Sequence, residues 1–481
     1  MTAAEERLRT LTEHTYGTWR AQKGWRKPLF IKDAEGVYMY DENDKRYLDF
    51  SSQMICSNLG HKNKVIIEAI IKQAEKMSYI APGFAHEAAE AAVEALLTVM
   101  PAGVDRFFFS TSGTEANEAA LKILRQYSAP GYKVISRYHS YHGATAAGIS
   151  FTGDPRRWYA ERARCTVEGV VFAPDAYCYR CPFGLAYPDC KIQCVEYVDY
   201  MIKEEGNVAA VIVEPVVGTN GRLVPPPEYL PRLREICDEN GVLLIADEVM
   251  TGLYRTGPAW AVQNWDVIPD ILTIAKGCTS AYTPVGITAT TSKIADYFEE
   301  EIMGHGHTYS FHPLALSAIP PALAEYKKLM ATGLPQRVSK HLEKRLYELE
   351  ERHECIGDAR GIGHFWALEI VKNRKTKERF NTKADTFRKA LMTDAIAAEA
   401  LKLGLYFAAW YDNLVIAPPL IITEEQVDEG IEVLDRALQV ADREVEHTDT
   451  PGSRSTQGFK GGESHQSGQD AGRVLYLARL E

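Results

Sequence analysis

Residues 110–117, which read STSGTEAN, are the first stretch whose residue types could do chemistry. They follow the apolar run RFFFS at 106–110 and open a helical pattern. Small hydroxyl and glycine residues at a helix N-terminus expose backbone N–H groups and the positive end of the helix dipole, which together attract a phosphate. Ser112, Gly113 and Thr114 are therefore candidate phosphate ligands. The structural alternative is a helix N-cap, with Ser112 or Thr114 as the cap residue.

Two charged residues follow later apolar runs in the same way. Asp247 ends the run VLLIAD at 242–247, and Lys276 ends the run ILTIAK at 271–276. A carboxylate at the rim of a sheet is partly desolvated and requires a cationic or N–H partner, and a lysine there is placed to act as a nucleophilic amine. Taken alone, Asp247 could cap the following turn and Lys276 could extend into solvent.

The three stretches together make a more specific pattern than each does alone. Each follows a strand pattern, and open α/β sheets bind their ligands beyond the carboxyl ends of the strands. A phosphate anchor, an acid and a primary amine are the groups that pyridoxal 5′-phosphate requires of a protein. The sequence therefore predicts a pyridoxal-phosphate site built from these strand ends.

The elements that must position these residues alternate along the chain. Short apolar runs separated by amphipathic stretches of helical length are typical of parallel βαβ units, whose strands are covered on both faces. The expected strands are 106–110, 133–136, 169–172, 209–213 and 242–246, and the expected helices between them are 114–126, 195–203 and 228–239. We expect a large α/β domain over residues 61–320.

The pattern changes after residue 313 and predicts a smaller α+β domain over residues 321–445. We expect helices at 314–330, 335–352, 383–403 and 424–443 and strands at 365–371, 405–407 and 414–416. Residues 1–60 form an N-terminal segment that we expect to pack with the small domain. Residues 446–481 are rich in Gly, Ser, Gln, His and Asp and are expected to be a disordered tail.

Composition excludes several classes of function. The 481 residues contain 54 Lys and Arg against 65 Asp and Glu, a net charge of -11, which argues against nucleic-acid and anionic-membrane partners. The sequence has no apolar run long enough to span a membrane and no hydrophobic signal core at its N-terminus. An odd number of cysteines, nine, is typical of a reducing compartment. We therefore expect a cytoplasmic enzyme.

Several motifs together resemble the class III pyridoxal-phosphate aminotransferases, of the amine or ω-amino acid–pyruvate transaminase type. The motifs are STSGTEANEAALK from 110, YHSYHG at 138–143, IVEP at 212–215, DEVMTGLYRTG from 247, AKG at 275–277 and GHTYS at 306–310. The resemblance extends over nearly the whole chain from about residue 26 to 441. It implies the fold type I of pyridoxal-phosphate transferases, which is aspartate-aminotransferase-like, with a large, mostly parallel sheet and a small α+β domain.

The resemblance also implies roles for the residues around the cofactor ring. Lys276 would hold the cofactor covalently and, once released, move a proton between the substrate and the cofactor. Asp247 would keep the pyridine nitrogen protonated, and Tyr141 and Val249 would cover the two faces of the ring. These roles make Lys276, Asp247 and Tyr141 the expected catalytic residues.

The remaining cofactor contacts implied by the resemblance include one from a second subunit. Ser112, Gly113 and Thr114 would bind the phosphate together with Thr308 of the partner subunit. His142 and Glu214 would line the cofactor pocket. A phosphate site shared between chains makes a homodimer with shared active sites the expected assembly.

The activity implied by the resemblance is transamination by a ping-pong mechanism, from a primary amine or ω-amino acid to a keto acid such as pyruvate. Ala408 occupies the position, counted from APPL at 417–420, where many relatives place a substrate-binding arginine. Thr219 replaces the glutamate of the ornithine and 4-aminobutyrate branch. The alternatives are an intramolecular aminomutase similar to glutamate-1-semialdehyde aminomutase and a catalytically silent binding protein with this fold.

Four of the nine cysteines lie close together in the sequence, at Cys178, Cys181, Cys190 and Cys194. Four thiols at such spacings could bind zinc or, as a weaker alternative, an iron–sulfur centre, could form disulfides, or could pack as free thiols. Apart from the first pair, the spacing matches no standard zinc pattern, and prolines and glycine between the cysteines indicate a compact loop. We therefore expect free packed thiols and no bound metal.

Overall fold

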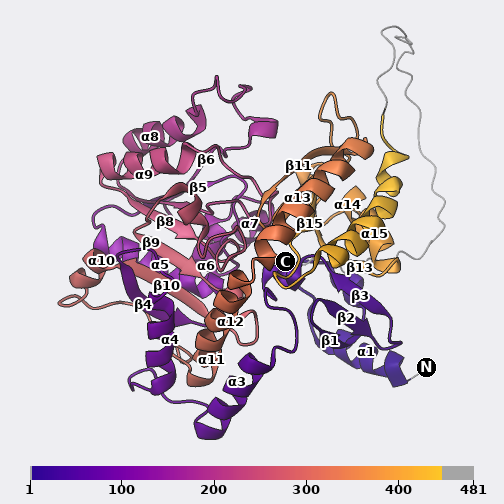
Figure 1. Cartoon of the computed structure of the whole chain (residues 1–481). Coiled ribbons are helices and arrows are strands. Elements are labelled where there is room, and N and C mark those ends of the chain that lie inside the picture. The colour runs from indigo at the N-terminus through magenta and orange to yellow at the C-terminus, as the bar shows by residue number, and fades with distance from the viewer. Residues whose placement is uncertain (1–2, 447–481) are drawn as a thin grey trace.

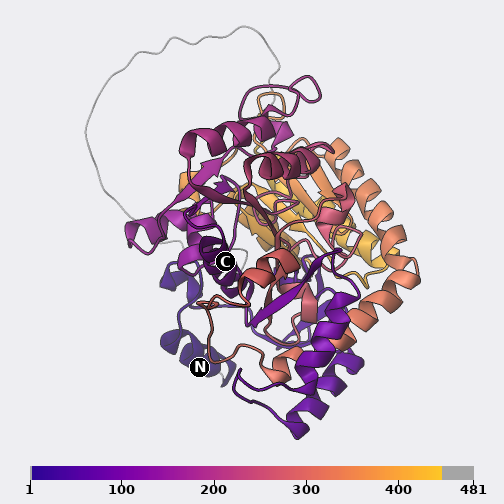
Figure 2. The same cartoon turned by 90° about the vertical axis from the view of Figure 1, so that its left-hand side faces the viewer.

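The computed structural model describes residues 3–446, so the predicted tail lies outside the described residues from 447 on. The chain folds into two α/β bodies that lie side by side, with the N-terminal strands next to the C-terminal helices (Figure 1). Figure 2 shows the molecule from the left-hand side of Figure 1, with the yellow C-terminal elements behind the large body.

The large body is built on a seven-stranded sheet with the strand order β4-β10-β9-β8-β7-β5-β6. The strands are β4 (Val104–Ser110), β5 (Lys133–Arg137), β6 (Val170–Ala173), β7 (Val208–Val213), β8 (Leu243–Asp247), β9 (Ile271–Ile274) and β10 (Gly286–Thr291). Only β10 runs antiparallel to its neighbours β4 and β9. The mostly parallel sheet confirms the predicted fold class. It also brings the carboxyl ends of the other strands to one edge.

Helices cover both faces of this sheet, which explains the continuous apolar runs of its strands. Along β7, Val211 and Val213 face a core shared with α8 (Gln193–Glu205) and α9 (Tyr229–Asn240). The alternate residues Ala210 and Ile212 face the opposite core, which includes α5 (Gly113–Tyr127) and α6 (Ala146–Phe151). The edge helices are α3 (Lys64–Lys76), α4 (Glu87–Leu97), α7 (Arg156–Arg162), α10 (Ser292–Tyr297), α11 (Pro313–Leu316) and α12 (Ile319–Ala331).

The small body combines both ends of the chain. Its sheet has the order β11-β12-β15-β14, and a second sheet joins the N-terminal strands to β13 in the order β1-β2-β3-β13. Its elements are β1 (Ile31–Glu35), β2 (Tyr38–Asp41), β3 (Arg46–Asp49), α13 (Leu334–Arg352), β11 (Ile356–Ile362), β12 (Phe365–Ile370), α14 (Met392–Lys402), β13 (Leu405–Tyr406), β14 (Ala408–Trp410), β15 (Asn413–Ile416) and α15 (Glu424–Asp442). Val37, Leu48 and Phe50 are buried in one core with these C-terminal helices. We propose the same division into domains that the sequence suggested.

Two predicted helices are wrong in extent. The helix expected at 314–330 is broken into α11 and α12, because Pro320 and Pro321 lack an N–H group and begin a new helix instead of continuing one. The helix expected at 383–403 starts only at Met392, where the Asp394 carboxylate accepts a 2.8 Å hydrogen bond from the Leu391 N–H and fixes the helix start.

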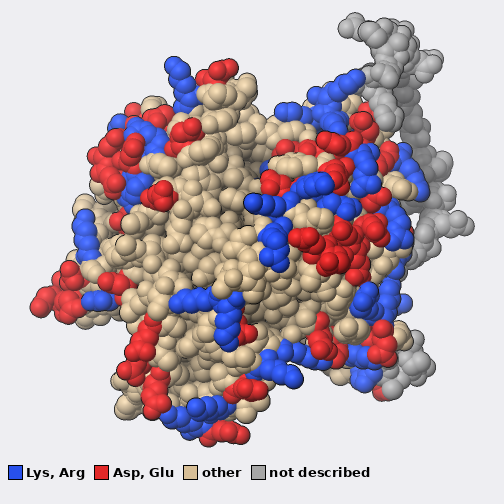
Figure 3. Space-filling view, viewed as in Figure 1, with Lys and Arg blue, Asp and Glu red and all other residues tan. Residues whose placement is uncertain are grey.

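The surface in the view of Figure 3 carries both signs of charge at its periphery and a broad, largely uncharged area across its middle. Acidic and basic side chains are interspersed over the small body on this face. No helix among the described residues is long and apolar enough to cross a membrane.

His353, at the end of α13, links that helix to α15. Its Nδ1 lies 2.6 Å from an Asp442 carboxylate oxygen and its Nε2 lies 3.0 Å from one of Asp435. Burial lowers the pKa of His353, but hydrogen bonds and attraction from Asp442 and Asp435 outweigh this and raise its pKa. Arg352 also pairs with Asp435. A raised histidine pKa stabilises the fold fully below the unfolded value of about 6.5 and stops doing so as the pH rises through the folded value.

We expect His353→Gln to lower the free energy of unfolding by about 2 kcal/mol near pH 6, the scale of hydrogen bonds to charged groups. The loss should shrink as the pH rises toward about 9 and passes through the raised pKa of the histidine. Urea unfolding at both pH values measures this, with His14→Gln, an exposed histidine, as the control. An equal loss at both pH values would show that the His353 charge does not stabilise the fold.

Candidate active site

A cavity of about 620 Å³ lies at the carboxyl edge of the large sheet. Loops that follow β4, β5, β7, β8 and β9 meet there with the N-terminal segment. The cavity is lined by Thr18, Trp19, Met54, Cys56, Thr111, Ser112, Gly113, Thr114, Asn117, Tyr141, His142, Gly143, Ala144, Glu214, Asp247, Val249, Met250, Ala275, Lys276, Ala281, Thr283, Pro284 and Val285. The structure thus brings all but one of the sequence-predicted site residues to one place, Thr308 being the exception.

The STSGTEAN stretch begins α5 and is both a cap and a candidate anion site. The Ser112 side chain accepts a hydrogen bond from the Glu115 N–H at 3.4 Å, so the structural alternative holds as an N-cap. The Thr114 hydroxyl accepts hydrogen bonds from the Ala144 and Thr145 N–H groups, both at 3.1 Å. This leaves the start of the helix dipole directed at the cavity, where an anion is stabilised.

Backbone packing keeps this helix start close to the neighbouring strand ends. A Cβ added at Gly113 would lie 2.9 Å from both methyl groups of Val249. A Cβ at Gly286 would lie 2.0 Å from the Ser112 carbonyl oxygen. Since side chains do not tolerate such distances, both glycines are required for the helix to approach the sheet this closely.

Asp247 lies at the end of β8 and is almost fully buried. One carboxylate oxygen accepts from the Val249 N–H at 3.0 Å, and the other contacts Asn117 Nδ2 at 2.9 Å and His142 Nδ1 at 2.7 Å. Burial raises the pKa of Asp247, but the hydrogen bonds and charge of His142, together with Asn117, lower it below its usual value. Asp247 is therefore a buried carboxylate that stays ionised at neutral pH.

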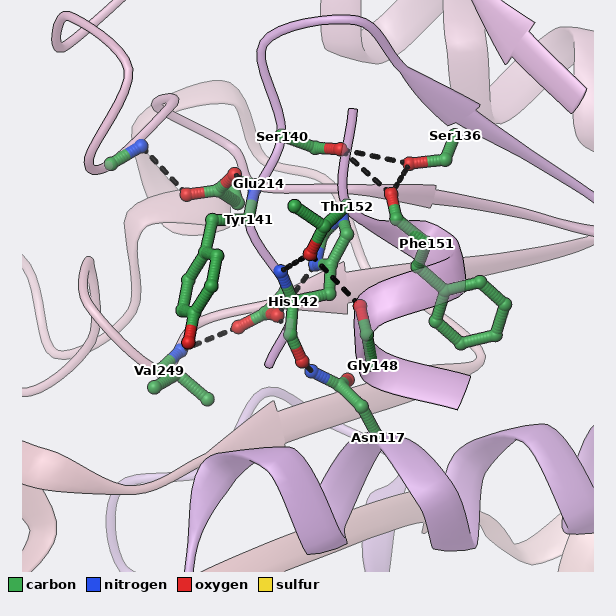
Figure 4. Close-up of polar contacts among 12 residues, drawn as sticks. Asn117, Ser136, Ser140, Tyr141, His142, Gly148, Phe151, Thr152, Glu214 and Val249 are labelled. Carbon is green, nitrogen blue, oxygen red and sulfur yellow. Dashed lines mark hydrogen bonds and ion pairs between the residues drawn. The ribbon is translucent and has the colours of Figure 1, made fainter. Parts of the chain in front are cut away.

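The loop after β5 presents Tyr141 and His142 and is held by Glu214. One Glu214 carboxylate oxygen accepts from the Tyr141 N–H at 2.9 Å, and the other accepts from the Gly218 N–H at 2.6 Å. Burial raises the pKa of Glu214, with His142 opposing this rise and Asp247 adding to it. Figure 4 shows the Tyr141 ring extending from the loop that Glu214 holds, and His142 enclosed by its neighbours.

The far side of the Tyr141 ring is packed on a cation. The Arg156 guanidinium carbon lies 3.6 Å from the Tyr141 ring centroid and 4.3 Å from that of Trp410. Asp154 pairs with this guanidinium through two hydrogen bonds to its Nε, at 3.1 and 3.0 Å. This sandwich fixes the orientation of the Tyr141 ring at the cavity.

Lys276 begins a short 3-10 helix directly after β9, and its side chain lines the cavity. Its φ of 45° lies in the left-handed region, which a lysine adopts at a cost of about 1 kcal/mol or more. The carbonyl of the next residue, Gly277, accepts a hydrogen bond of 2.8 Å from the buried Tyr326 hydroxyl. Strain held by surrounding contacts is typical of functional sites.

Three positions discussed in the sequence analysis do not contribute a charge or a ligand to this cavity in one chain. Thr308 is exposed on the surface segment after α10, and its carbonyl accepts a 3.0 Å hydrogen bond from the Tyr79 hydroxyl. Ala408 is half-buried in an apolar cluster, with its N–H donating to Ser51 at 2.9 Å. Thr219 contacts the Met250 sulfur at 3.7 Å.

Sequence reasoning missed three residues of this site. Asn117 is within the recognised motif but faces Asp247 only because α5 lays its second turn against the end of β8. Arg156 is 1% exposed, and nothing in the sequence around it indicated burial. Trp19 reaches the cavity from the N-terminal segment, a long-range contact that no local pattern indicates.

The residues present fit pyridoxal 5′-phosphate. The cavity volume is within the range of about 300–1,000 Å³ of small-molecule sites. It offers a helix start for the phosphate, an ionised carboxylate for a protonated ring nitrogen, and an amine. His142 Nε2 is buried without a hydrogen-bond partner, which leaves a polar atom beside this acid.

Comparisons with known proteins agree with this geometry. The family model of class III aminotransferases matches residues 21–438. Putrescine–pyruvate aminotransferase of Pseudomonas aeruginosa is 34% identical, over 85% of this chain and 90% of its own. Leucine/methionine racemase of Thermococcus litoralis is 33% identical, over 85% of this chain and 90% of its own.

Among solved structures, taurine:2-oxoglutarate aminotransferase of Bifidobacterium kashiwanohense, in complex with pyridoxal phosphate and glutamate, is similar to this chain. It has a TM-score of 0.87 and 35% identity, covering 92% of this chain and 99% of that one. The fold and family that the motifs predicted are confirmed. The chain therefore belongs to the class III aminotransferases: it is a transaminase, and its cofactor is pyridoxal 5′-phosphate.

Proposed function

We propose that this transaminase moves the amino group of a primary amine or ω-amino acid to a small keto acid such as pyruvate, by a ping-pong mechanism. The observation that carries the proposal is the meeting of Lys276, the ionised Asp247 and the α5 start around one cavity. When bound, the cofactor supplies an electron sink that stabilises negative charge at the substrate carbon. The side chains of this chain must bind, orient and exchange protons around it.

Lys276 is the proposed covalent attachment point and the proton carrier. It is the only lysine among the described residues that line the cavity, and no arginine lines it. Lys276 would hold the cofactor when it is bound, and its freed amine would carry a proton between the substrate carbon and the cofactor. The side chain of Lys276 lines the cavity, which places its amine for this role.

Asp247 is proposed to keep the ring nitrogen protonated. Its carboxylate is ionised and held by His142, Asn117 and the backbone, so it can pair with a cationic ring. Tyr141 and Val249 are proposed to cover the two ring faces. His142 and Glu214 act as positioning residues, since their printed contacts hold Asp247 and the loop of Tyr141.

The phosphate is proposed to bind at the start of α5. Backbone N–H groups of Gly113 and Thr114 and the Ser112 side chain are the proposed donors. The Thr114 hydroxyl already accepts two backbone N–H groups, so we assign this residue's contribution to its backbone. A helix N-terminus binds a phosphate group with both its N–H groups and its dipole.

The wall of the cavity away from these groups carries no fixed charge among its described residues. Trp19, Met54 and Met250 line it, and no arginine is among the described lining residues. Ala408 and Thr219 add no charge that could select a dicarboxylate. Two of the relatives act on putrescine and taurine, judged by their names, and both compounds carry the amine on a CH₂ group. We therefore favour terminal amines as donors and a monocarboxylate such as pyruvate as acceptor.

A homodimer with shared active sites is proposed from the surface around Thr308. Phe84, Ile302 and Tyr309 are 62%, 83% and 58% exposed, and Tyr79 joins Thr308 and Tyr309 by a hydrogen bond and a ring contact. Exposed apolar side chains in such number mark a protein interface. Thr308 of the partner subunit would complete the phosphate site.

We expect Lys276→Ala to lose covalent cofactor attachment and at least about a thousandfold of transaminase activity, because both the attachment and the proton carrier are gone. Borohydride reduction followed by mass spectrometry should add one cofactor mass to the wild type and none to this variant. The exposed Lys64→Ala is the control. Equal labelling of Lys276→Ala would contradict the assignment.

We expect ¹⁵N from a labelled primary amine, such as putrescine or taurine, to appear in alanine when pyruvate is the acceptor. The kcat/KM for pyruvate should exceed that for 2-oxoglutarate by about tenfold or more, since a second carboxylate would be left unpaired in an apolar wall. Label that stays in a rearranged or racemised donor would indicate a mutase or racemase. No consumption of any amine by cofactor-loaded protein would indicate the silent binding protein.

We expect Thr308→Val to weaken cofactor binding about tenfold, the value of one hydrogen bond to a charged group. Fluorescence titration of the cofactor-free dimer measures the affinity, and light scattering measures the oligomeric state. Thr10→Val, an exposed threonine of α1 (Ala3–His14), is the control. A fully active monomer, or unchanged affinity in a dimer, would overturn the shared site.

A further inference from the structure

The four neighbouring cysteines surround one small cavity. Cys178, Cys181, Cys190 and Cys194 all line a partly open space of about 20 Å³ formed by the loop after β6 and the start of α8. Such a volume holds one water molecule or one ion. The other walls are mainly apolar and aromatic, with Tyr177, Phe183, Leu185, Tyr187 and Pro226 among them. The four cysteines are free thiols, as expected from their spacing, and they line one common space.

The four thiols belong to two short, hydrogen-bonded turns. Cys178 begins the 3-10 helix Cys178–Arg180, and the Cys181 carbonyl accepts from the Gly184 N–H at 3.1 Å. The Cys190 N–H donates to the Ala186 carbonyl at 2.8 Å, and Cys194 lies in the first turn of α8. Each pair of cysteines is therefore fixed by local backbone contacts, and the two pairs are brought together across the cavity.

The space has no cationic side chain among its described lining residues. Thiolates gathered there would repel one another. A divalent cation at the centre would remove this repulsion.

The spacing of the sulfur atoms is wider than in a metal-bound cluster. No three of these four described cysteines have sulfur atoms that all lie within 4.8 Å of one another. Neutral thiols that line a water-sized space lie apart from one another. A bound zinc ion would draw the thiolates together, since each zinc–sulfur bond is about 2.3 Å long. Binding of an ion would therefore require the four thiols to move closer together. All four cysteines are free, so no disulfide competes for them.

We propose that Cys178, Cys181, Cys190 and Cys194 bind one Zn²⁺ as a structural site that fixes the turn docking the large domain onto the small one. On binding, each thiol releases its proton to solvent and four zinc–sulfur bonds form, with no change in oxidation state. All four positions are filled by sulfur, as in closed structural zinc sites, so the ion takes no part in transamination.

The docking role follows from what lies between the first two cysteines. The Arg180 Nε contacts the buried Glu369 carboxylate at 2.5 Å, and its Nη1 donates to the Lys377 carbonyl at 2.6 Å. The Tyr179 carbonyl accepts from Lys377 Nζ at 2.6 Å. The Tyr177 hydroxyl donates to Glu369 as well. These contacts join the cysteine turn to β12 and the segment after it, in the small domain.

The test is metal analysis of holoenzyme purified under reducing conditions. We expect about one zinc per chain in the wild type and in Cys165→Ser, an exposed cysteine outside the cluster, and less than about 0.2 in Cys181→Ser and Cys190→Ser. Removal of zinc by a chelator and addition of Co²⁺ to the wild type should give the thiolate charge-transfer and tetrahedral d–d bands of a Co(Cys)₄ centre. The cobalt measurement uses only the wild type, so it does not depend on the folding of any variant.

Three results would overturn the site: wild type that holds no zinc and binds no cobalt, iron with inorganic sulfide in place of zinc, or disulfides within the cluster by mass spectrometry. The docking role has its own readout. Hydrogen exchange at residues 177–181 and at β12 should rise at least about tenfold in zinc-free wild type relative to the holoenzyme. Unchanged exchange would overturn the docking role.

Discussion

The buried charge of Asp247 is the constraint on which the rest of the active site depends. A carboxylate that is almost fully removed from water stays ionised only if its oxygens are bound, and breaking such an arrangement typically costs about 3–5 kcal/mol. Asn117, His142 and the Val249 N–H supply the contacts. They come from α5, the loop after β5 and the turn after β8, so the charge is satisfied only when three separate segments are in place.

The parallel sheet makes this convergence possible. Because β5, β7, β8 and β9 run in one direction, the loops that follow them open on the same edge, and β4, two strands beyond β9, ends there too. The small domain is attached by a second buried charge. Burial raises the pKa of Glu369, but Arg360 and Arg180 outweigh this and lower it, so it too stays ionised. The proposed zinc site would stabilise the turn that carries Arg180. It would therefore help to hold the large domain against the small one.

The chemistry could be predicted from the sequence because each reactive residue lies next to the strand or helix pattern that positions it. Asp247 and Lys276 end apolar runs, and STSGTEAN opens a helix, so type and position are visible without tertiary structure. What it could not see are partners set by distance in the chain. Asn117, Arg156 and Trp19 contact the site only through packing of α5, α7 and the N-terminal segment.

The same limit applies to the fold. β10 reads GITATT and lacks an apolar run, yet it is buried because the Thr288 hydroxyl donates to the Ala116 carbonyl at 2.7 Å. The strands at 31–49 were not predicted, since they are completed by β13 from the other end of the chain. The family, the fold class and the cofactor were predicted correctly, because the motifs that specify them are continuous in the sequence.

The most direct test of the central claim is the rate of a single amine half-reaction followed by stopped-flow absorbance in Asp247→Asn. The variant keeps the shape of the side chain but removes its charge and one of its two accepting oxygens. The account predicts a rate constant at least about a hundredfold lower than in the wild type with the cofactor still bound, as expected for loss of an aligned charge. A rate within about tenfold of the wild type would contradict the claim that this buried charge drives the chemistry.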